Sequence, residues 1–439
     1  MIYKLFSIFF EFTRRLGFWF IDFVRSSKIR IQYNNILKEL TGLEKNRSDK
    51  LNRLLTHASK TTNFYKIYSG LELKEFPIID KNSIKVNINS FLSTSYKENQ
   101  RFKVVTSGST GTPFTVYQNS EKKIRNLADT LYFSELGGYK LGYKLFYLKI
   151  WVKEKLRSNI HYFLQNIVPI DVLKLDDKKI KIIVDEISNS KGNVSFLGYV
   201  TAWETICKFL DKNDYPKLIK EVKSVITMSE SLDYYTKTRM EYYYGVIPMS
   251  RYSNLENGII AQQIMGSGPK YLINTASYIV EILNIENDLP APSGKLGRIV
   301  VTDLFNYALP MIRYDTGDFG ILSHESDKFG NQYLELVEGR KLDNIYNSEG
   351  HHISSYLMYR NMWKYTEIAQ YQIIQTGFRQ YIFKISLEKG TNFKKEKELT
   401  SEFLEYLGDN AEFKIEYVDE IPQLSSGKRR KVINLYYQN

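Results

Sequence analysis

Residues 106–113 read Thr-Ser-Gly-Ser-Thr-Gly-Thr-Pro and gather hydroxyl side chains and two glycines in one short segment. The apolar residues on either side, 103–105 and 114–117, predict two strands with this segment at the tip of their hairpin. Glycine lets a backbone approach a ligand closely, and exposed N–H and hydroxyl groups bind anions. The segment therefore suits a polyphosphate, although a surface turn rich in serine, threonine and glycine remains an alternative.

This segment is not a Walker A loop. No Gly-Lys-Ser/Thr closes it, and no helix is predicted to begin at Pro113. If the loop holds ATP, the lysine that neutralises charge must come from elsewhere in the chain.

Further side chains suited to nucleotide chemistry occur in Arg251–Gly258, Arg313–Asp318, Gly339–Gly350 and Pro422–Lys428. A tyrosine ring can stack on a purine, a carboxylate can ligate Mg²⁺, and an aspartate can accept ribose hydroxyls. An arginine can bind ribose or phosphate through its fork of donors, and a lysine on a glycine loop can neutralise developing charge. Taken alone, each segment is more simply explained by a partly buried tyrosine, an Asx turn or a solvated charge.

The order and spacing of these five segments resemble the acyl-adenylate-forming superfamily. The chain is most similar to its phenylacetate–CoA ligase-like branch, which includes capsular polysaccharide biosynthesis proteins of the CapK type. Further motifs of that branch are Phe76–Lys81, Gly198–Ala202 and Ser229–Leu232. The resemblance extends over residues 50–435.

The resemblance implies a role for each matched residue. The phosphate loop would contain Thr106, Ser107, Gly108, Ser109, Thr110 and Gly111, with 107–111 holding the β- and γ-phosphates of ATP. Tyr252 would pack on adenine, with the backbone of Ser229 and Glu230 lining its other side.

The remaining implied roles concern ribose, metal and reacting groups. Asp318 would hold the ribose, assisted by Arg340, and Glu256 would bind Mg²⁺. Lys428 would contact the substrate carboxylate and the α-phosphate during adenylation. Because an anionic carboxylate attacks an anionic phosphorus, neutralisation and positioning would supply most of the catalysis.

The chain departs from the family pattern at several positions. Leu255 replaces a threonine, and Leu342 stands where many relatives carry an aspartate hinge, which moves the expected hinge to Lys341 or Asp343. The segment expected to support thioester formation reads Asn347–His352, and its two histidines either serve that step or are ordinary exposed loop residues. These departures bear on coenzyme A more than on ATP.

The implied fold is α/β, with a large multi-layered adenylation domain and a small mobile α+β C-terminal domain. We expect an aromatic amphipathic segment at 1–30, an ATP- and acyl-substrate-binding domain at 31–338 and the mobile domain at 339–439. The implied reaction activates a carboxylic acid with ATP as an acyl-adenylate, releases pyrophosphate, and transfers the acyl group to coenzyme A, a carrier thiol or an amine such as an amino sugar. The implied pathway is capsular or O-antigen polysaccharide biosynthesis; a catalytically silent member that acts as a membrane-surface assembly partner is the alternative.

The local patterns predict where helices and strands fall. Residues 31–100 read as helix-rich, Ser120 as the cap of a helix to Leu136, and 145–226 as alternating strands and helices. Gly294–Val301 and Met311–Leu322 read as β-rich. Candidate residues for the acid pocket are Tyr132, Phe133, Trp151, His161, Tyr199 and Trp203.

Composition narrows the class of protein. The chain has 439 residues with 43% hydrophobic and 25% charged content, which is typical of a globular protein. Its net charge of +12 is scattered among 49 acidic residues, so we expect no nucleic-acid partner, although an RNA-binding surface is a third alternative. The single cysteine, Cys207, excludes an intrachain disulfide and a cysteine-based metal site, and fits a reducing compartment.

The first 30 residues alternate apolar side chains with charges such as Arg14, Arg15 and Asp22. The charges interrupt any run long enough for a membrane span, and they also spoil a signal-peptide core. Two interpretations stay open: a helix that packs on the body of the protein, and an amphipathic helix on a membrane surface. We therefore expect a cytoplasmic protein, with peripheral contact at the inner membrane face as the open question.

Overall fold

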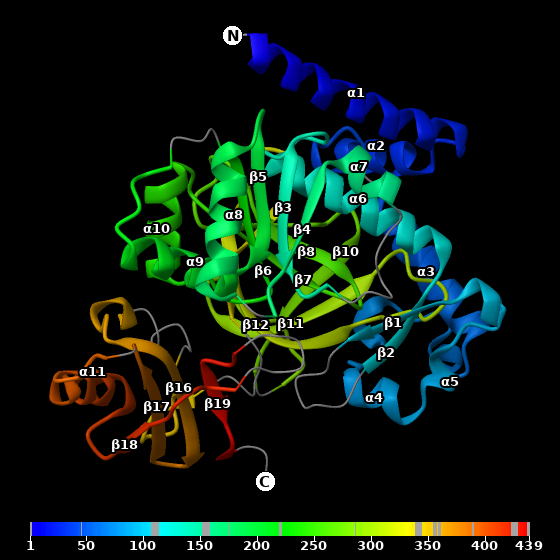
Figure 1. The fold of residues 1–439 in the computed structure, drawn as a ribbon. Coiled ribbons are helices and arrows are strands. Elements are labelled where there is room, and N and C mark those ends of the chain that lie inside the picture. Colours follow the sequence, from blue (N-terminus) through cyan, green and yellow to red (C-terminus); the bar gives the residue numbers. More distant parts are fainter. Residues whose placement is uncertain are drawn as a thin grey trace.

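The computed structural model describes the chain except for residues 1, 45, 107–113, 152–158, 174, 219–221, 286, 339–344, 354–357, 359–360, 389, 423–428 and 437–439. A large lobe is built on an 11-stranded sheet in the order β10-β11-β12-β13-β9-β8-β7-β6-β5-β3-β4 (Figure 1). Its strands are β3 Lys144–Lys149, β4 Ile167–Asp171, β5 Val194–Tyr199, β6 Val222–Met228, β7 Met249–Asn254, β8 Gly258–Gln263, β9 Tyr271–Ile273, β10 Tyr278–Leu283, β11 Leu296–Asp303, β12 Tyr314–Ser326 and β13 Gln332–Glu338.

One end of this sheet is parallel and the other is antiparallel. Neighbours among β4, β3, β5, β6 and β7 pair in parallel, while the pairs from β7 to β10 are antiparallel. Parallel strands need cover on both faces, which explains the nearly continuous burial of Val194–Gly198 in β5. The predicted alternation of strands and helices over 145–226 is confirmed.

Helices α7 Asn159–Gln165, α8 Asp177–Asn189, α9 Val200–Lys212 and α10 Tyr234–Tyr244 lie among and after the parallel strands. Buried side chains of α8, α9 and α10 pack on the sheet around Trp203. Asp176 and Asp233 cap α8 and α10, because each carboxylate accepts a hydrogen bond from the third backbone N–H beyond it, at 2.8 Å.

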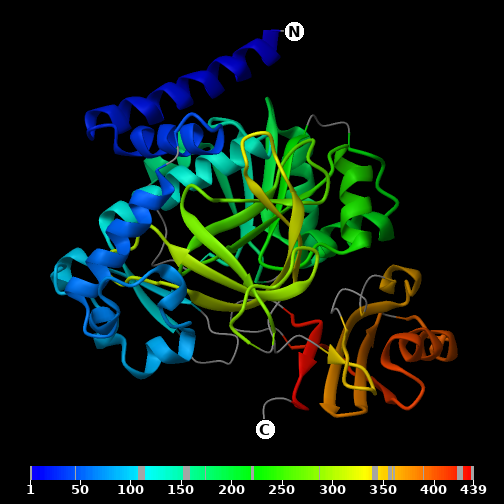
Figure 2. The same ribbon diagram turned by 180° about the vertical axis from the view of Figure 1, so that it is seen from behind.

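The helix-rich N-terminal region is confirmed. Its elements are α1 Ile2–Val24, α2 Lys28–Leu40, α3 Arg47–Thr61, α4 Lys81–Val86 and α5 Ile88–Phe91, with short 3₁₀ turns at Tyr65–Tyr68, Leu73–Glu75 and Glu98–Gln100. Helix α1 runs along one edge of the molecule in both views (Figures 1 and 2). Among the residues that the structure describes, no helix combines the length and hydropathy that crossing a bilayer requires.

The hairpin predicted around residues 106–113 is present. Strands β1 Phe102–Thr106 and β2 Phe114–Gln118 are antiparallel, and Thr106 faces Phe114 where the chain turns. The loop between them, 107–113, lies outside the described residues. The Lys81 ammonium lies 5.2 Å from the Phe114 ring centre, which brings the Phe76–Lys81 motif beside the hairpin.

Helix α6 Ser120–Leu136 follows the hairpin and packs against α2 and β8. Its range agrees with the prediction, but the predicted cap is wrong. Ser120 is already helical, and the preceding Asn119 makes no capping bond, because its side-chain oxygen accepts the backbone N–H of Tyr307 at 3.0 Å.

A small α+β lobe follows the large one and lies below it in Figure 1. It contains β14 Ile345–Tyr346, β15 His352–Ile353, a turn at Met362–Lys364, β16 Ile368–Gly377, β17 Gln380–Leu387, α11 Glu396–Leu407, β18 Glu412–Tyr417 and β19 Val432–Asn434. Four of these strands form a sheet in the order β18-β17-β16-β19, and Phe383 and Phe403 pack in its core. The predicted α/β class with a smaller α+β part is thus confirmed, while the predicted boundary at 339 lies outside the described residues.

Candidate functional site

The predicted site residues that the structure describes gather near the carboxyl ends of parallel strands. Strand β5 ends at Tyr199, β6 ends just before Ser229, and β7 carries Tyr252. Pairing of Met228 with Arg251 places the last two segments side by side. In open α/β sheets, this edge is where ligands bind.

Tyr252 and Asp318 are in direct contact. The Tyr252 hydroxyl donates to a carboxylate oxygen of Asp318 at 2.8 Å and lies 3.1 Å from the Thr316 hydroxyl. The Tyr252 ring is 9% exposed, and burial together with the Asp318 charge raises the pKa of Tyr252 well above its usual value. The phenol therefore stays protonated and donates a hydrogen bond to Asp318.

Glu256 contacts β12, the strand that carries Asp318. Its side chain is 6% exposed, and Tyr314 from β12 donates a hydrogen bond to its carboxylate at 3.2 Å. Its backbone oxygen accepts the Gln118 amide of β2 at 3.0 Å, which ties this residue to the strand that leaves the phosphate-loop hairpin. Leu255, in the preceding position, is 60% exposed.

Ser229 and Glu230 join two of the predicted motifs. The Glu230 carboxylate accepts the backbone N–H and the hydroxyl of Thr201 at 2.8 and 3.2 Å, at the start of α9. A carboxylate is stabilised at a helix N-terminus, so this contact holds the loop after β6 against α9. Ser229 has a φ of +72°, a left-handed conformation that costs energy in a residue with a side chain and is often found at functional sites.

Several predicted residues lie outside what the structure describes. These are Ser107, Gly108, Ser109, Thr110, Gly111, Arg340 and Lys428, while Thr106 is described only as the last residue of β1. Lys341 and Asp343, the two predicted hinge positions, are also outside. Of the two loop histidines, His351 is described, and its side chain is 77% exposed.

The two lobes contact one another through charged side chains that the sequence analysis did not single out. Lys431, just before β19, lies 2.9 Å from Glu204 of α9 and 3.5 Å from Asp233 at the start of α10. Lys208 of α9 donates to the backbone oxygen of Ala369 at 2.9 Å. Burial alone would raise the pKa of Glu204, but the charges of Lys431 and Lys208 lower it to about 2.

Three of the six candidate acid-pocket residues are buried in hydrophobic cores. Trp203 and Phe133 are fully buried in two separate hydrophobic cores, and Tyr132 is 6% exposed. Tyr199 and Trp151 are half-buried, and the side chain of His161 is not described. The sequence did not mark Tyr314 and Thr316 individually as site residues, although both lie within the Arg313–Asp318 motif.

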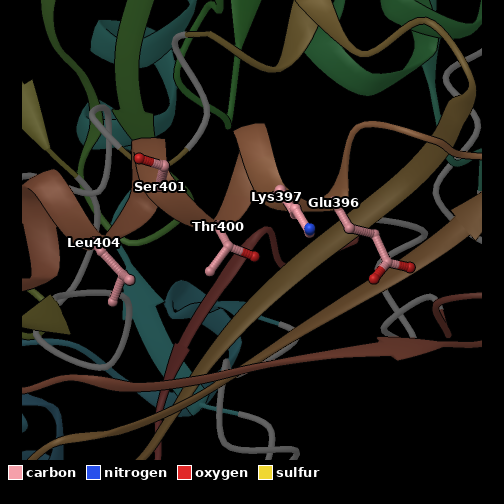
Figure 3. A pocket seen from close by; sticks show the side chains of 5 residues that line it. All are labelled: Glu396, Lys397, Thr400, Ser401 and Leu404. Atoms are coloured by element: carbon pink, nitrogen blue, oxygen red, sulfur yellow. The ribbon is translucent and has the colours of Figure 1, made fainter.

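In the ranges that the structure describes, neither a cluster of metal ligands nor the hollow found on α11 adds residues to this site. Within the described part of the chain, no group of three or more His, Cys, Asp or Glu side chains is arranged to hold a metal ion. A shallow hollow on α11 is lined by Glu396, Lys397, Thr400, Ser401 and Leu404 (Figure 3), none of which is a predicted site residue.

Comparison with known proteins agrees with the resemblance seen in the motifs. Residues 345–435 match the family model of the CapK C-terminal domain. Protein CapK of Staphylococcus aureus is 22% identical over 424 residues, which cover 91% of this chain and 90% of that protein.

Solved structures extend the match to the whole fold. 2-Hydroxyisobutyryl-CoA ligase, in its postadenylation state with 2-HIB-AMP, superposes with a TM-score of 0.69 at 14% identity, over 88% of each chain. The same ligase in its thioesterification state with 2-HIB-AMP and CoA gives 0.55 at 16% identity, over 89% of each chain. The protein thus shares the fold of 2-hydroxyisobutyryl-CoA ligase, and its residues 345–435 match the family model of the CapK C-terminal domain.

Proposed function

We propose that the protein is an AMP-forming acyl ligase. A carboxylate oxygen of the acid attacks the α-phosphorus of ATP, the bond from that phosphorus to the bridging oxygen breaks, and pyrophosphate leaves. A thiol or amine then attacks the acyl carbon and loses its proton. The bond from the acyl carbon to the bridging oxygen breaks, and AMP leaves with that oxygen. Every atom of the acid and of ATP is accounted for in acyl product, AMP and pyrophosphate.

The observation that carries this proposal is the contact between Tyr252 and Asp318. The two residues are 66 positions apart in the chain, yet they share a hydrogen bond of 2.8 Å at the ligand-binding edge of the sheet. A site that stacks adenine on one residue and binds ribose through the other needs the two within one nucleoside's length. The fold shared with acyl-adenylate-forming ligases supports the same assignment.

The surrounding residues fit ATP and Mg²⁺. Mg²⁺ is commonly bound by one or two carboxylates together with phosphate oxygens and water. A single protein carboxylate, that of Glu256, is therefore enough for the proposed metal site. Glu230 is committed to Thr201 through its side chain, which suits the proposed role because that role uses only backbone atoms. We assign the phosphates to the loop 107–111, ribose assistance to Arg340, and charge neutralisation to Lys428.

The arrangement of the two lobes supports the proposal that this conformation belongs to the adenylation half-reaction. The TM-score is 0.69 for the postadenylation state of 2-hydroxyisobutyryl-CoA ligase and 0.55 for its thioesterification state, at similar identity and coverage. A rigid rotation of one lobe changes such a score without changing either lobe. We infer that the small lobe rotates between the two half-reactions.

The second substrate is an acyl acceptor with a thiol or an amine. Coenzyme A, a carrier thiol and an amino sugar are the three candidates, and the resemblance to CapK supports a role in assembling surface polysaccharide in the cytoplasm.

The test is pyrophosphate release from ATP with a panel of amino acids, hydroxy acids and aryl acids. At least one acid should stimulate release, and Lys428→Ala should nearly abolish it while ATP still binds. Lys397→Ala, an exposed lysine on the outer face of α11, is the matched control and should behave as wild type. Binding of ATP without release for any acid would support the catalytically silent alternative.

A further inference from the structure

Helix α1 packs on the body through Phe18 and through two buried acidic side chains, and it turns most of its other apolar side chains outward. Glu11 and Asp22 are 7% and 3% exposed. On the opposite side, Phe6, Phe9, Phe10, Leu16, Phe20 and Phe23 are all between 52% and 70% exposed. We call these six residues the aromatic face; their spacing places them on one side of the helix. Burying such side chains is worth about 1.5–3 kcal/mol each, so an exposed row of them indicates a partner.

The helix is held in this orientation by the body of the protein. The Glu11 carboxylate accepts the backbone N–H and the side-chain amide of Asn193 at 2.7 and 2.8 Å. A Cβ at Gly142 would lie 2.2 Å from the Glu11 backbone oxygen, and one at Gly192 would lie 2.4 Å from its carboxylate. These two glycines let α1 sit close, and the polar contacts prevent the aromatic face from rotating inward.

The charge around the helix favours an anionic partner. Residues 1–38 contain the basic residues Lys4, Arg14, Arg15, Arg25, Lys28, Arg30 and Lys38, and the acidic residues Glu11 and Asp22. Both acids are buried, and the Asp22 carboxylate is occupied by the backbone N–H groups of Ile29 and Arg30 at 3.0 and 2.8 Å. Arg25, Lys28 and Arg30 are exposed just beyond the aromatic face.

The shape of this region suits a flat partner. The aromatic face extends for about 25 Å at 1.5 Å per residue. Helix α1 forms a ridge at the rim of the molecule, and its N-terminal end reaches beyond the body (Figures 1 and 2). A ridge with apolar side chains outward and basic side chains at its end matches helices that lie in the plane of a membrane interface.

We propose that α1 binds the protein to a lipid surface containing anionic lipid, with the aromatic face in the acyl-headgroup boundary and the basic residues at the headgroups. The proposal concerns a surface away from the nucleotide site and does not require that site to be active. It decides between the two interpretations that the sequence left open: the polar side of α1 packs on the body, and the apolar side meets the membrane.

The experiment is flotation of the full chain with vesicles of phosphatidylglycerol and phosphatidylcholine, and with phosphatidylcholine alone. Wild type should float with the anionic vesicles and much less with the neutral ones. Phe9→Ser/Phe20→Ser should lower partitioning at least about tenfold, because two buried aromatic side chains are lost. Arg25→Gln/Lys28→Gln should lower binding to anionic vesicles only. The matched control is Ile67→Ser/Val86→Ser, which changes side chains that are 78% and 87% exposed elsewhere.

Thermal unfolding of each variant verifies that it is folded, and sedimentation velocity without lipid measures self-association. The proposal is overturned if wild type does not float, if the phenylalanine variant floats equally well, or if neutral vesicles bind as strongly as anionic ones. Self-association that disappears in Phe9→Ser/Phe20→Ser, without vesicle binding by wild type, would also overturn it and assign the face to a second copy of the chain.

Discussion

The hydroxyl of Tyr252 determines how the Asp318 carboxylate is presented. Because the phenol keeps its proton, it donates a hydrogen bond to one carboxylate oxygen of Asp318 at 2.8 Å and so holds that carboxylate in place. The Thr316 hydroxyl lies 3.1 Å from the same phenol oxygen and donates its own proton to the backbone oxygen of Ile299 at 2.9 Å. Under the proposed roles, the carboxylate that would hold the ribose is therefore oriented by the side chain that would pack on adenine.

Replacing Tyr252 with Phe keeps the ring and removes this donor. We expect ATP to bind about tenfold more weakly, since a hydrogen bond to a charged group contributes on the order of 1.5–3 kcal/mol. Calorimetric titration with ATP measures the effect, and Tyr242→Phe, an exposed tyrosine of α10, is the control. Equal ATP affinity in wild type and Tyr252→Phe would separate this contact from nucleotide binding.

The carboxylate of Glu256 should set the magnesium requirement. Glu256→Gln keeps the size and the hydrogen bond from Tyr314 but removes the charge, so half-maximal activity should need at least about tenfold more Mg²⁺. The measurement is a Mg²⁺ titration of pyrophosphate release at saturating ATP. Glu335→Gln, on the exposed side of β13, should leave the titration unchanged. An unaltered titration in Glu256→Gln would remove Glu256 from the site.

At the scale of elements, α9 connects the loop after β6, part of the proposed nucleotide site, to the small lobe. Its first turn receives the Glu230 carboxylate, and one turn later Glu204 meets Lys431 of the small lobe at 2.9 Å. Lys431 stands three residues after Lys428 and directly before β19, so this ion pair fixes one end of the segment that carries Lys428.

Glu204→Gln should loosen the small lobe. The variant leaves Lys431 without its nearest carboxylate, which costs about 1–3 kcal/mol of docking free energy. The readout is the rate of trypsin cleavage at Arg340 or Lys341, which should rise relative to wild type. Glu420→Gln breaks the exposed ion pair with Arg429 inside the small lobe and serves as control. Cleavage of Glu204→Gln at the wild-type rate would show that the pair does not hold the lobes together.

Local elements were more predictable than their contacts. The hairpin 102–118 follows from two apolar runs around a glycine-rich turn, and the helix 120–136 from its periodicity, because these patterns are local in the chain. The pair Glu204–Lys431 joins residues 227 positions apart, and nothing near either residue indicates the other. The sequence showed that α1 is amphipathic but not which side faces outward, because Asn193, which fixes that orientation, lies 182 residues away.

At the scale of the molecule, the proposed function makes the position of the small lobe decide which half-reaction the protein can perform. Tyr252, Glu256 and Asp318, the described residues proposed to bind the nucleotide and its metal ion, are on the large lobe, and Lys428 precedes the small-lobe strand β19 in the sequence. The Glu204–Lys431 ion pair is therefore expected to affect activity by holding the small lobe in position against the large lobe. The roles of the site residues remain predictions implied by the family resemblance, whereas the contact between the lobes required the assembled fold.

The pH dependence of lobe docking follows from Glu204. Burial raises the pKa of Glu204, but the charges of Lys431 on the small lobe and of Lys208 on the same helix lower it from 4.5 to about 2, so the contribution of the ionised carboxylate is complete above about pH 4.5 and is lost as the pH falls toward 2. Small-angle scattering should show one compact arrangement between about pH 5.5 and 8.5, because Glu204 stays charged throughout that range. Separation of the lobes between about pH 5.5 and 7 would contradict this assignment of the ion pair.

The central claim is that the Tyr252–Asp318 wall and Lys428 act on one nucleotide. A crystal structure with α,β-methylene ATP and Mg²⁺ tests it without knowledge of the acid. The account predicts the ribose hydroxyls on the Asp318 carboxylate, the adenine against Tyr252, and the Lys428 ammonium within about 4 Å of an α-phosphate oxygen. A nucleotide bound away from Asp318, or a small lobe docked so that Lys428 cannot reach the α-phosphate, would contradict it.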